Sequence, residues 1–325
     1  MSPSPSGTRH GPWKRFWTFY GLSLLLLGLV PLLSALFGTS MEFGALAARA
    51  SGATGVPWTS NLWDVVRLCF AEPGLWLLIV GSAVPSFAAL VVLAAARNSW
   101  QWRAFARRFR PLGLSGELLR RELASYGLLV VSVVLCLLAA FALREWLAPG
   151  EYVQTPVRLA WGVLSALVFA ALLDQGAVLE EAGWRGYATP LLQNGLLDPL
   201  RAALLIGVLW GLWHVPRDVV SGLVEQFGLA QYALLYLPAF TLGTVTVSIV
   251  AAYFMNRLGG SLIPAIMVHG LTNDAVGFAG MATIERALTP DHQLSKALPF
   301  LALSIGIALV AGRELGRRRH TTQAP

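Results

Sequence analysis

Residues 125–143, SYGLLVVSVVLCLLAAFAL, form a run of nineteen residues without a charged side chain. A helix rises about 1.5 Å per residue, so a helix of this length crosses the roughly 30 Å hydrocarbon layer of a bilayer. The run does not alternate between apolar and polar residues, as a half-buried strand would. It therefore predicts a transmembrane helix.

Further apolar runs before and after this one predict that the chain crosses the membrane repeatedly. The 325 residues are 56% apolar and only 13% charged, with a mean hydropathy of +0.62, which is too apolar for a soluble domain of this size. Together the runs predict an all-α fold, a polytopic bundle of about eight transmembrane helices. The other runs cover approximately residues 16–37, 74–96, 157–178, 202–215, 232–255, 261–280 and 297–311.

The excess of basic residues predicts the orientation of the bundle. The chain has 24 Lys and Arg against 17 Asp and Glu, a net charge of +7. Most of the excess lies in the N-terminal lead, in residues 97–121 and in residues 313–319. Next to apolar spans, such clusters indicate cytoplasmic loops and contacts with anionic lipid of the inner leaflet, rather than nucleic-acid binding. We expect a multi-pass protein of the cell (inner) membrane with both termini in the cytoplasm.

The basic loop at residues 97–121 has a pattern of its own. Trp102, Phe105 and Phe109 interleave with arginines at near-helical spacing. This pattern is typical of an amphipathic helix lying on the inner leaflet, although a solvated charged connection would show it as well. The two cysteines, Cys69 and Cys136, do not have the spacing of a metal or redox pair.

Two adjacent acids stand out at Glu180 and Glu181, with Arg185 following. Ionisable groups are costly within a bilayer and are by default a functional hypothesis there. Glu181 and Arg185 are four residues apart and share a helix face, so an ion pair between them would give Glu181 an orienting role. Glu180 points about 100° away and has no cation along its own helix, which makes it the candidate general base toward water. The alternative is a helix end dipping into interfacial water.

Two histidines lie in later apolar runs, each with a polar or aromatic neighbour one turn away. Trp210 precedes His214 by four residues, and Asn273 follows His269 by four. A turn near Leu197 lies seventeen residues from both Glu180 and His214, so an antiparallel hairpin would bring these two level. A core histidine bonded to a backbone carbonyl is the alternative for His214. Asn273 could orient an imidazole or donate to an oxyanion. Together these residues predict one polar active centre.

These motifs resemble those of the CAAX-protease and bacteriocin-processing family (CPBP, or Abi) of intramembrane endopeptidases. The resemblance covers roughly residues 164–280 and includes the phrase GSLIP at residues 260–264. It implies that Glu180 activates water, that Glu181 and Arg185 support it, that His214 assists, and that His269 with Asn273 stabilises the oxyanion. Trp210 stands where the family usually has phenylalanine, which keeps an aromatic wall.

The composition and the apolar runs, together with the resemblance, predict a domain organisation, and the resemblance implies a substrate class. We expect a disordered cytoplasmic lead at residues 1–15, transmembrane helices in 16–155, a catalytic core in 156–281, and a last helix with a basic tail in 282–325. The substrate would be a membrane-associated, lipidated or hydrophobic peptide or protein. Eukaryotic relatives process prenylated CAAX ends, whereas bacterial relatives are linked to peptide maturation, bacteriocin immunity or regulated proteolysis, and this composition looks bacterial.

A metal and two other classes of function stay open. The chain has no HExxH motif, so we expect no cofactor, but Glu180, His214 and His269 could supply three zinc ligands in principle. The same acids and histidines could serve a secondary transporter or proton relay extended by Asp174, although no inverted repeat is visible. A catalytically idle membrane scaffold is the third class. The sequence assigns no role to Asp174 or to the outer loop at residues 38–73.

Overall fold

The computed structural model describes residues 10–39, 41–58, 61–112, 116–147, 149, 160–278 and 289–317. Within these residues the regular structure is helical and includes no strand, which confirms the predicted all-α fold class. The expected disordered lead is wrong at its C-terminal part, because α1 already begins at His10. The ring of Trp13 stacks on Trp17 one turn later, so aromatic packing extends this helix beyond its apolar segment.

Six stretches of the described residues are helical, long and apolar enough to cross a membrane, as expected of a multi-pass membrane protein. They are Gly11–Leu36, Pro73–Ala95, Leu118–Leu147, Pro199–Val220, Leu229–Arg257 and Pro290–Glu314. Each matches one of the predicted spans. Their principal helices are α1 (His10–Leu36), α4 (Trp76–Ala95), α6 (Gly116–Leu147), α10 (Pro199–Trp213), α14 (Leu237–Arg257) and α17 (Pro290–Ala311).

The two remaining predicted spans are shorter helices. The expected continuous span at 157–178 is wrong, because Asp174 separates α7 (Ala160–Leu173) from α8 (Gln175–Gly183). Asp174 leaves the helical region with ψ 127°, and its Oδ1 accepts a hydrogen bond from the backbone N–H of Ala177 at 2.7 Å. Such a side-chain cap offers the backbone an alternative to continuing the helix. The span predicted at 261–280 is α15 (Ile263–Phe278), and residues 157–159 and 279–280 lie outside the described part of the chain.

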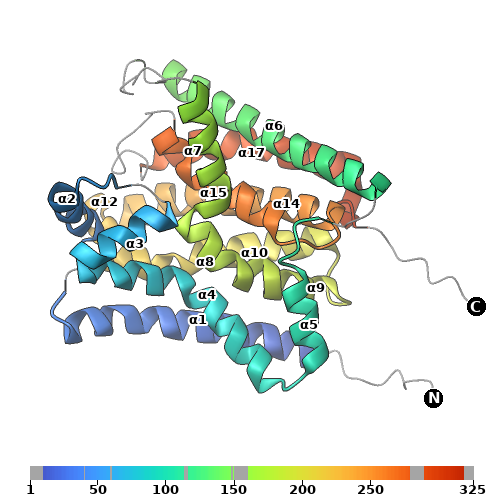
Figure 1. The fold of residues 1–325 in the computed structure, drawn as a ribbon, viewed down its shortest axis with the longest axis horizontal. Helices are drawn as coiled ribbons and strands as arrows, with labels where there is room; N and C mark the ends of the chain where they lie inside the picture. The colour runs from blue at the N-terminus through green and yellow to red at the C-terminus, as the bar shows by residue number, and fades with distance from the viewer. Residues whose placement is uncertain are drawn as a thin grey trace, which may run out of the picture.

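Helix α14 lies at the centre of the bundle, in contact with α10, α15 and α17 (Figure 1). Helix α15 packs on α8, α8 on α4, and α4 on α1, while α6 covers α17. Small residues permit the closest approaches, as is usual between membrane helices. At Gly207 in α10, an added Cβ would lie 2.5 Å from the Cα of Val245 in α14. Gly183 in α8 meets the backbone of Pro85 in α4 even more tightly.

The basic loops gather at one end of the bundle. The backbone carbonyl of Arg108, just after α5 (Ser99–Arg107), accepts a hydrogen bond from the Leu262 N–H at 2.7 Å. Arg317, after η4 (Gly312–Glu314), donates to the carbonyl of Gln193 at the end of α9 (Thr189–Gln193) at 2.6 Å. The start of α1 and the end of the described chain lie on this side (Figure 1). The loops therefore share one face of the bundle. The cytoplasmic location of this face stays a prediction.

Helix α5 confirms that the basic loop contains a helix with two different faces. Phe105 is buried and would lie 3.1 Å from a Cβ added at Gly186, which follows α8 in the chain. Trp100 is 62% exposed on the other side. Contact of this exposed face with lipid stays a prediction.

Short helices occupy the opposite end. The outer loop predicted at 38–73 forms α2 (Phe43–Thr54), α3 (Leu62–Ala71) and η1 (Pro73–Leu75), which enclose a small apolar core of their own. A backbone bridge between Asn61 and Asp174 ties this unit to the break between α7 and α8. Helix α12 lies at the same end (Figure 1). After α10 the chain passes through α11 (Val215–Val220), α12 (Leu223–Phe227), α13 (Leu229–Gln231) and the π-helical turn η3 (Tyr232–Tyr236).

Candidate active site

Helix α8 places both acids in the interior. Glu180 is 6% exposed and Glu181 is fully buried. The helix begins at the Asp174 cap and runs into a π-helical turn, η2 (Trp184–Ala188). Single π turns inside α-helices occur frequently at functional sites and shift the register of the residues that follow.

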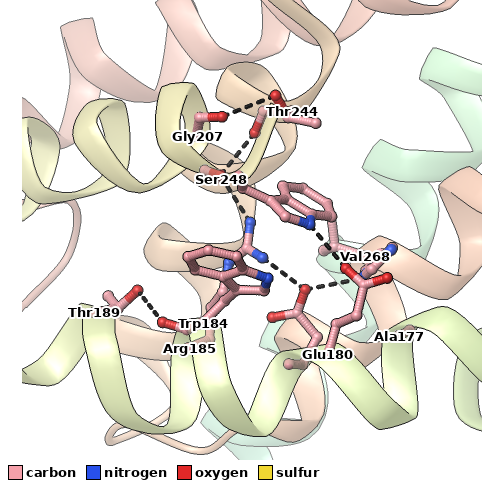
Figure 2. A network of polar contacts seen from close by, with 12 residues as sticks. Ala177, Glu180, Trp184, Arg185, Thr189, Gly207, Thr244, Ser248 and Val268 are labelled. Atoms are coloured by element: carbon pink, nitrogen blue, oxygen red, sulfur yellow. Dashed lines mark hydrogen bonds and ion pairs between the residues drawn. The ribbon is translucent and has the colours of Figure 1, made fainter. Parts of the chain in front are cut away.

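The predicted pair between Glu181 and Arg185 is confirmed. Arg185 Nη1 donates to Glu181 Oε1 at 2.7 Å, and its Nη2 donates to Ser248 Oγ at 2.7 Å. From Ser248 the network continues through Thr244 to the carbonyl of Gly207 (Figure 2). The guanidinium also lies 4.3 Å from the ring centroid of Trp210. A buried ion pair that is also anchored to a neighbouring helix holds both partners in one orientation.

The same Glu181 oxygen orients His269. His269 Nδ1 lies 2.8 Å from Glu181 Oε1. A carboxylate oxygen accepts, so Nδ1 carries the proton and the neutral ring leaves Nε2 as the acceptor. Glu181 is thus bonded to a cation from its own helix and to an imidazole from α15. This arrangement gives Glu181 the geometry of an orienting residue.

Glu180 is held from a different helix. Trp210 Nε1 in α10 donates to Glu180 Oε2 at 2.8 Å. Oε1 accepts no hydrogen bond from the described residues and lies near the space left by Gly176. A Cβ added at Gly176 would lie 3.6 Å from Glu180 Oε1 and 3.2 Å from Asn273 Nδ2. One carboxylate oxygen is therefore fixed, and the other lies, like the amide of Asn273, beside the space that Gly176 leaves open.

Trp210 lies between the two imidazoles. Its ring centroid is 5.9 Å from that of His214 and 4.8 Å from that of His269. His214 Nδ1 lies 2.8 Å from the carbonyl oxygen of Trp210, which only accepts, so Nδ1 is the protonated nitrogen here as well. The backbone-carbonyl alternative for His214 thus holds for one nitrogen, while Nε2 forms no hydrogen bond within the described residues.

Asn273 lies near Glu180, but its amide is bound by a residue to which the sequence assigned no role. Asn273 Nδ2 donates to Asp174 Oδ1 at 3.1 Å, and Asp174 is 1% exposed. The primary amide has two N–H groups, so one remains for another acceptor. The expected contact of Asn273 with an imidazole is replaced by this bond. An acid interrupting an apolar run was the only signal in the sequence for a cap at this position.

The candidate residues therefore come together, but the three that were considered as zinc ligands are not arranged around a common point. Glu180, Glu181, Arg185, Trp210, His214, His269 and Asn273 form a single cluster of contacts within the membrane-embedded bundle. Within the described residues, no three His, Cys, Asp or Glu side chains gather as a metal-binding group. The trio considered for zinc does not have the geometry for it, and Nδ1 of both histidines is already engaged.

Replacing Asp174 with alanine is expected to lower activity more than stability. The change removes the α8 cap, which costs about 0.5–2 kcal/mol. It also releases Asn273, so we expect about a tenfold loss of turnover from a misplaced amide. The activity of the reconstituted protein and its thermal unfolding in detergent measure the two effects.

Two matched variants separate the effects of Asp174→Ala. Asp174→Asn keeps an oxygen for both the cap and Asn273, so it should retain most of the activity. Asp198→Ala removes the corresponding cap of α10, where Oδ1 accepts from the Arg201 N–H at 2.9 Å, and should affect stability alone. Equal activity losses in Asp174→Ala and Asp198→Ala would contradict a positioning role for Asp174.

Fold and site together define a multi-pass helical membrane protein with a buried acid–histidine centre. Residues 156–274 match the family described as type II CAAX prenyl endopeptidase Rce1-like, and every residue of the cluster lies in this segment. The chain is also 33% identical over 102 residues to CAAX prenyl protease 2 of Methanococcus maripaludis, a match that covers 31% of this chain and 37% of that protein. This segment is therefore similar to the CAAX-protease family, in agreement with the resemblance of the motifs.

Proposed function

We propose that the protein is an intramembrane endopeptidase that hydrolyses a peptide bond of a membrane-associated, lipidated or otherwise hydrophobic substrate. The observation that carries this proposal is the arrangement around Glu180. Trp210 holds one carboxylate oxygen, the other lies with the Asn273 amide beside the space that Gly176 leaves open, and two oriented imidazoles are nearby. The family match over residues 156–274 supports the same activity.

In the proposed reaction, Glu180 Oε1 removes a proton from a water molecule whose oxygen attacks the carbonyl carbon of the scissile bond. The free N–H of Asn273 donates to the oxyanion that forms. When His269 is protonated, both ring nitrogens donate, Nδ1 to Glu181 and Nε2 to the oxyanion. His214 Nε2 accepts a hydrogen bond from the water. This bond keeps a lone pair of the water oxygen directed at the carbonyl carbon. Collapse of the intermediate breaks the C–N bond, and the proton on Glu180 passes to the leaving amine.

Cleavage by the purified protein in liposomes tests this proposal. We expect hydrolysis of a hydrophobic membrane peptide by the wild type, detected as two products by mass spectrometry. Ion-dependent uptake of solute without cleavage would instead indicate a transporter. The structure gives that alternative less support than the sequence did, because Asp174 caps α8 and binds Asn273.

We further propose that the reaction proceeds without a metal ion. Within the described residues, the histidines and acids of the cluster do not gather as a set of metal ligands, and the Glu180 carboxylate has an oxygen available to take a proton from water. Activity should therefore persist after dialysis against a strong chelator, and added zinc should not increase it. Loss of activity with the chelator, recovery with zinc and a stoichiometric zinc content in the purified protein would contradict this.

The proposed location is the cell membrane, with the basic end toward the cytoplasm. The five arginines among residues 97–112 have no acidic residue between them, so this segment is suited to an anionic leaflet. The exposed Trp100 on α5 suits the interfacial depth at which aromatic rings gather.

A further inference from the structure

A second polar group lies three residues beyond His214, on α11. Asp218 is 1% exposed, and Arg217 donates to its Oδ1 from Nε at 3.0 Å and from Nη2 at 2.6 Å. The hydroxyl of Tyr232 donates to Oδ2 at 2.9 Å. Both oxygens of this carboxylate are therefore engaged, and the guanidinium is held in a fixed orientation.

The fixed guanidinium keeps donors for another molecule. The side chain of Arg217 is 38% exposed, and its Nη1 donates to no acceptor within the described residues. A planar guanidinium that is already oriented loses little further freedom when it binds a carboxylate through two donors. An arginine that served only to neutralise Asp218 would not need to leave the N–H groups of Nη1 available to another molecule.

A buried hydroxyl without a partner lies beside this pair. Tyr236 is fully buried, and its Oη has no hydrogen-bond partner among the described residues. The ring stacks on Tyr232 at 5.5 Å and on Phe240 at 5.8 Å, and the charges of both Arg217 and Asp218 act on the hydroxyl. Buried polar groups are nearly always paired, so an unpaired one next to a fixed cation points to a missing acceptor.

This group adjoins the catalytic cluster. Arg217 Cζ lies 5.9 Å from the ring centroid of Phe240, whose ring lies 5.0 Å from that of His214. The charge of Arg217 also acts on Glu180. The Phe240 ring thus contacts both Arg217 and His214, so Arg217 lies one side chain away from the cluster that contains Glu180.

We propose that Arg217, together with the Tyr236 hydroxyl, binds a carboxylate of the peptide substrate and so selects the bond that is cleaved. This inference rests on the proposed endopeptidase function. The carboxylate comes either from the free C-terminus of the substrate or from an acidic side chain near the scissile bond. Arg217 is then a specificity-determining residue, and Asp218 and Tyr232 hold its guanidinium in position.

Three peptides that share one hydrophobic sequence test the proposal with the full-length protein in liposomes. The first has a free C-terminal acid, the second a C-terminal amide, and the third an amide with one glutamate near the chain end. For the wild type we expect kcat/KM of at least one carboxylate peptide to exceed that of the plain amide by about tenfold or more, as for a hydrogen bond to a charged group. The peptide with the higher kcat/KM identifies the source of the carboxylate, either the chain end or the glutamate side chain.

Variants assign this preference to the residues. Arg217→Gln should bring the ratio of carboxylate to amide rates close to one, and the double variant Arg217→Gln with Asp218→Asn should do the same without leaving a buried charge. Tyr236→Phe removes only the unpaired hydroxyl and should lower the ratio while the protein stays folded. Arg201→Gln is the matched control, because Arg201 also pairs with an aspartate, Asp198, but lies at the other end of α10.

The outcomes are distinguishable. A ratio near one in the wild type, or a ratio that Arg217→Gln and Arg201→Gln change equally, overturns the carboxylate proposal while leaving the endopeptidase proposal intact. Absence of cleavage of all three peptides by the wild type overturns both.

Discussion

Replacing Glu180 with glutamine is expected to reduce the rate of peptide cleavage by about 10²–10⁴-fold, the range for loss of a general base. Glutamine keeps an oxygen that can accept the bond from Trp210 Nε1, which Glu180 Oε2 accepts at 2.8 Å. It cannot take a proton from water. The fold should therefore persist while the chemistry stops. Initial rates in liposomes and thermal unfolding of the same preparations measure the two properties.

A second glutamate provides the control for this substitution. Glu225 lies exposed on α12, away from the cluster contacts, so Glu225→Gln should keep the wild-type rate. Retention of half the wild-type activity by Glu180→Gln, at equal stability, would show that Glu180 is not the base. A fall in both variants together would indicate a general effect of lost charge.

Replacing Arg185 with methionine is expected to have the largest effect on stability. The substitution leaves Glu181 buried without its cation, and breaking a buried pair from one side typically costs about 3–5 kcal/mol. It also removes the donor to Ser248 and the cation over Trp210. We expect a much lower midpoint of denaturation in detergent than for Arg201→Met, because an exposed pair such as Arg201 with Asp198 contributes little.

A double substitution identifies the cause of this loss. Glu181→Gln keeps an oxygen for His269 Nδ1 but removes the charge, so Glu181→Gln with Arg185→Met should be more stable than Arg185→Met alone. This non-additivity is the usual behaviour of residues in contact. Equal unfolding of Arg185→Met and Arg201→Met would contradict the structural role of the buried pair.

Contacts within one helix could be predicted from the sequence. Glu181 with Arg185, and Trp210 with His214, are each four residues apart, and the repeat of the helix alone brings them together. Contacts between helices were predicted less well. The hairpin symmetry about Leu197 placed His214 level with Glu180, whereas Trp210, one turn earlier, makes the bond. The π-helical turn η2 lies between Glu180 and α10 and changes the register of the chain there, and no residue pattern in the sequence predicted this turn.

The break at Asp174 was missed for a related reason. Apolar length predicts a continuous helix, but a carboxylate that can cap the backbone competes with it, and tertiary packing of α15 decides the outcome. The bond to Asn273, 99 residues away, could not be read from spacing. The short helices α2 and α3 were likewise unpredicted, since each is below spanning length and buries its apolar side in a small core shared with η1 and the start of α4.

Whether Glu180 cleaves membrane proteins in the cell is tested by comparing protein termini in membranes of cells that carry the wild type or Glu180→Gln at equal abundance. We expect specific new termini of membrane-associated proteins to be present with the wild type and absent with the variant. Identical sets of termini in both cells, while deletion of the protein still changes the phenotype, would contradict it and favour a non-catalytic role.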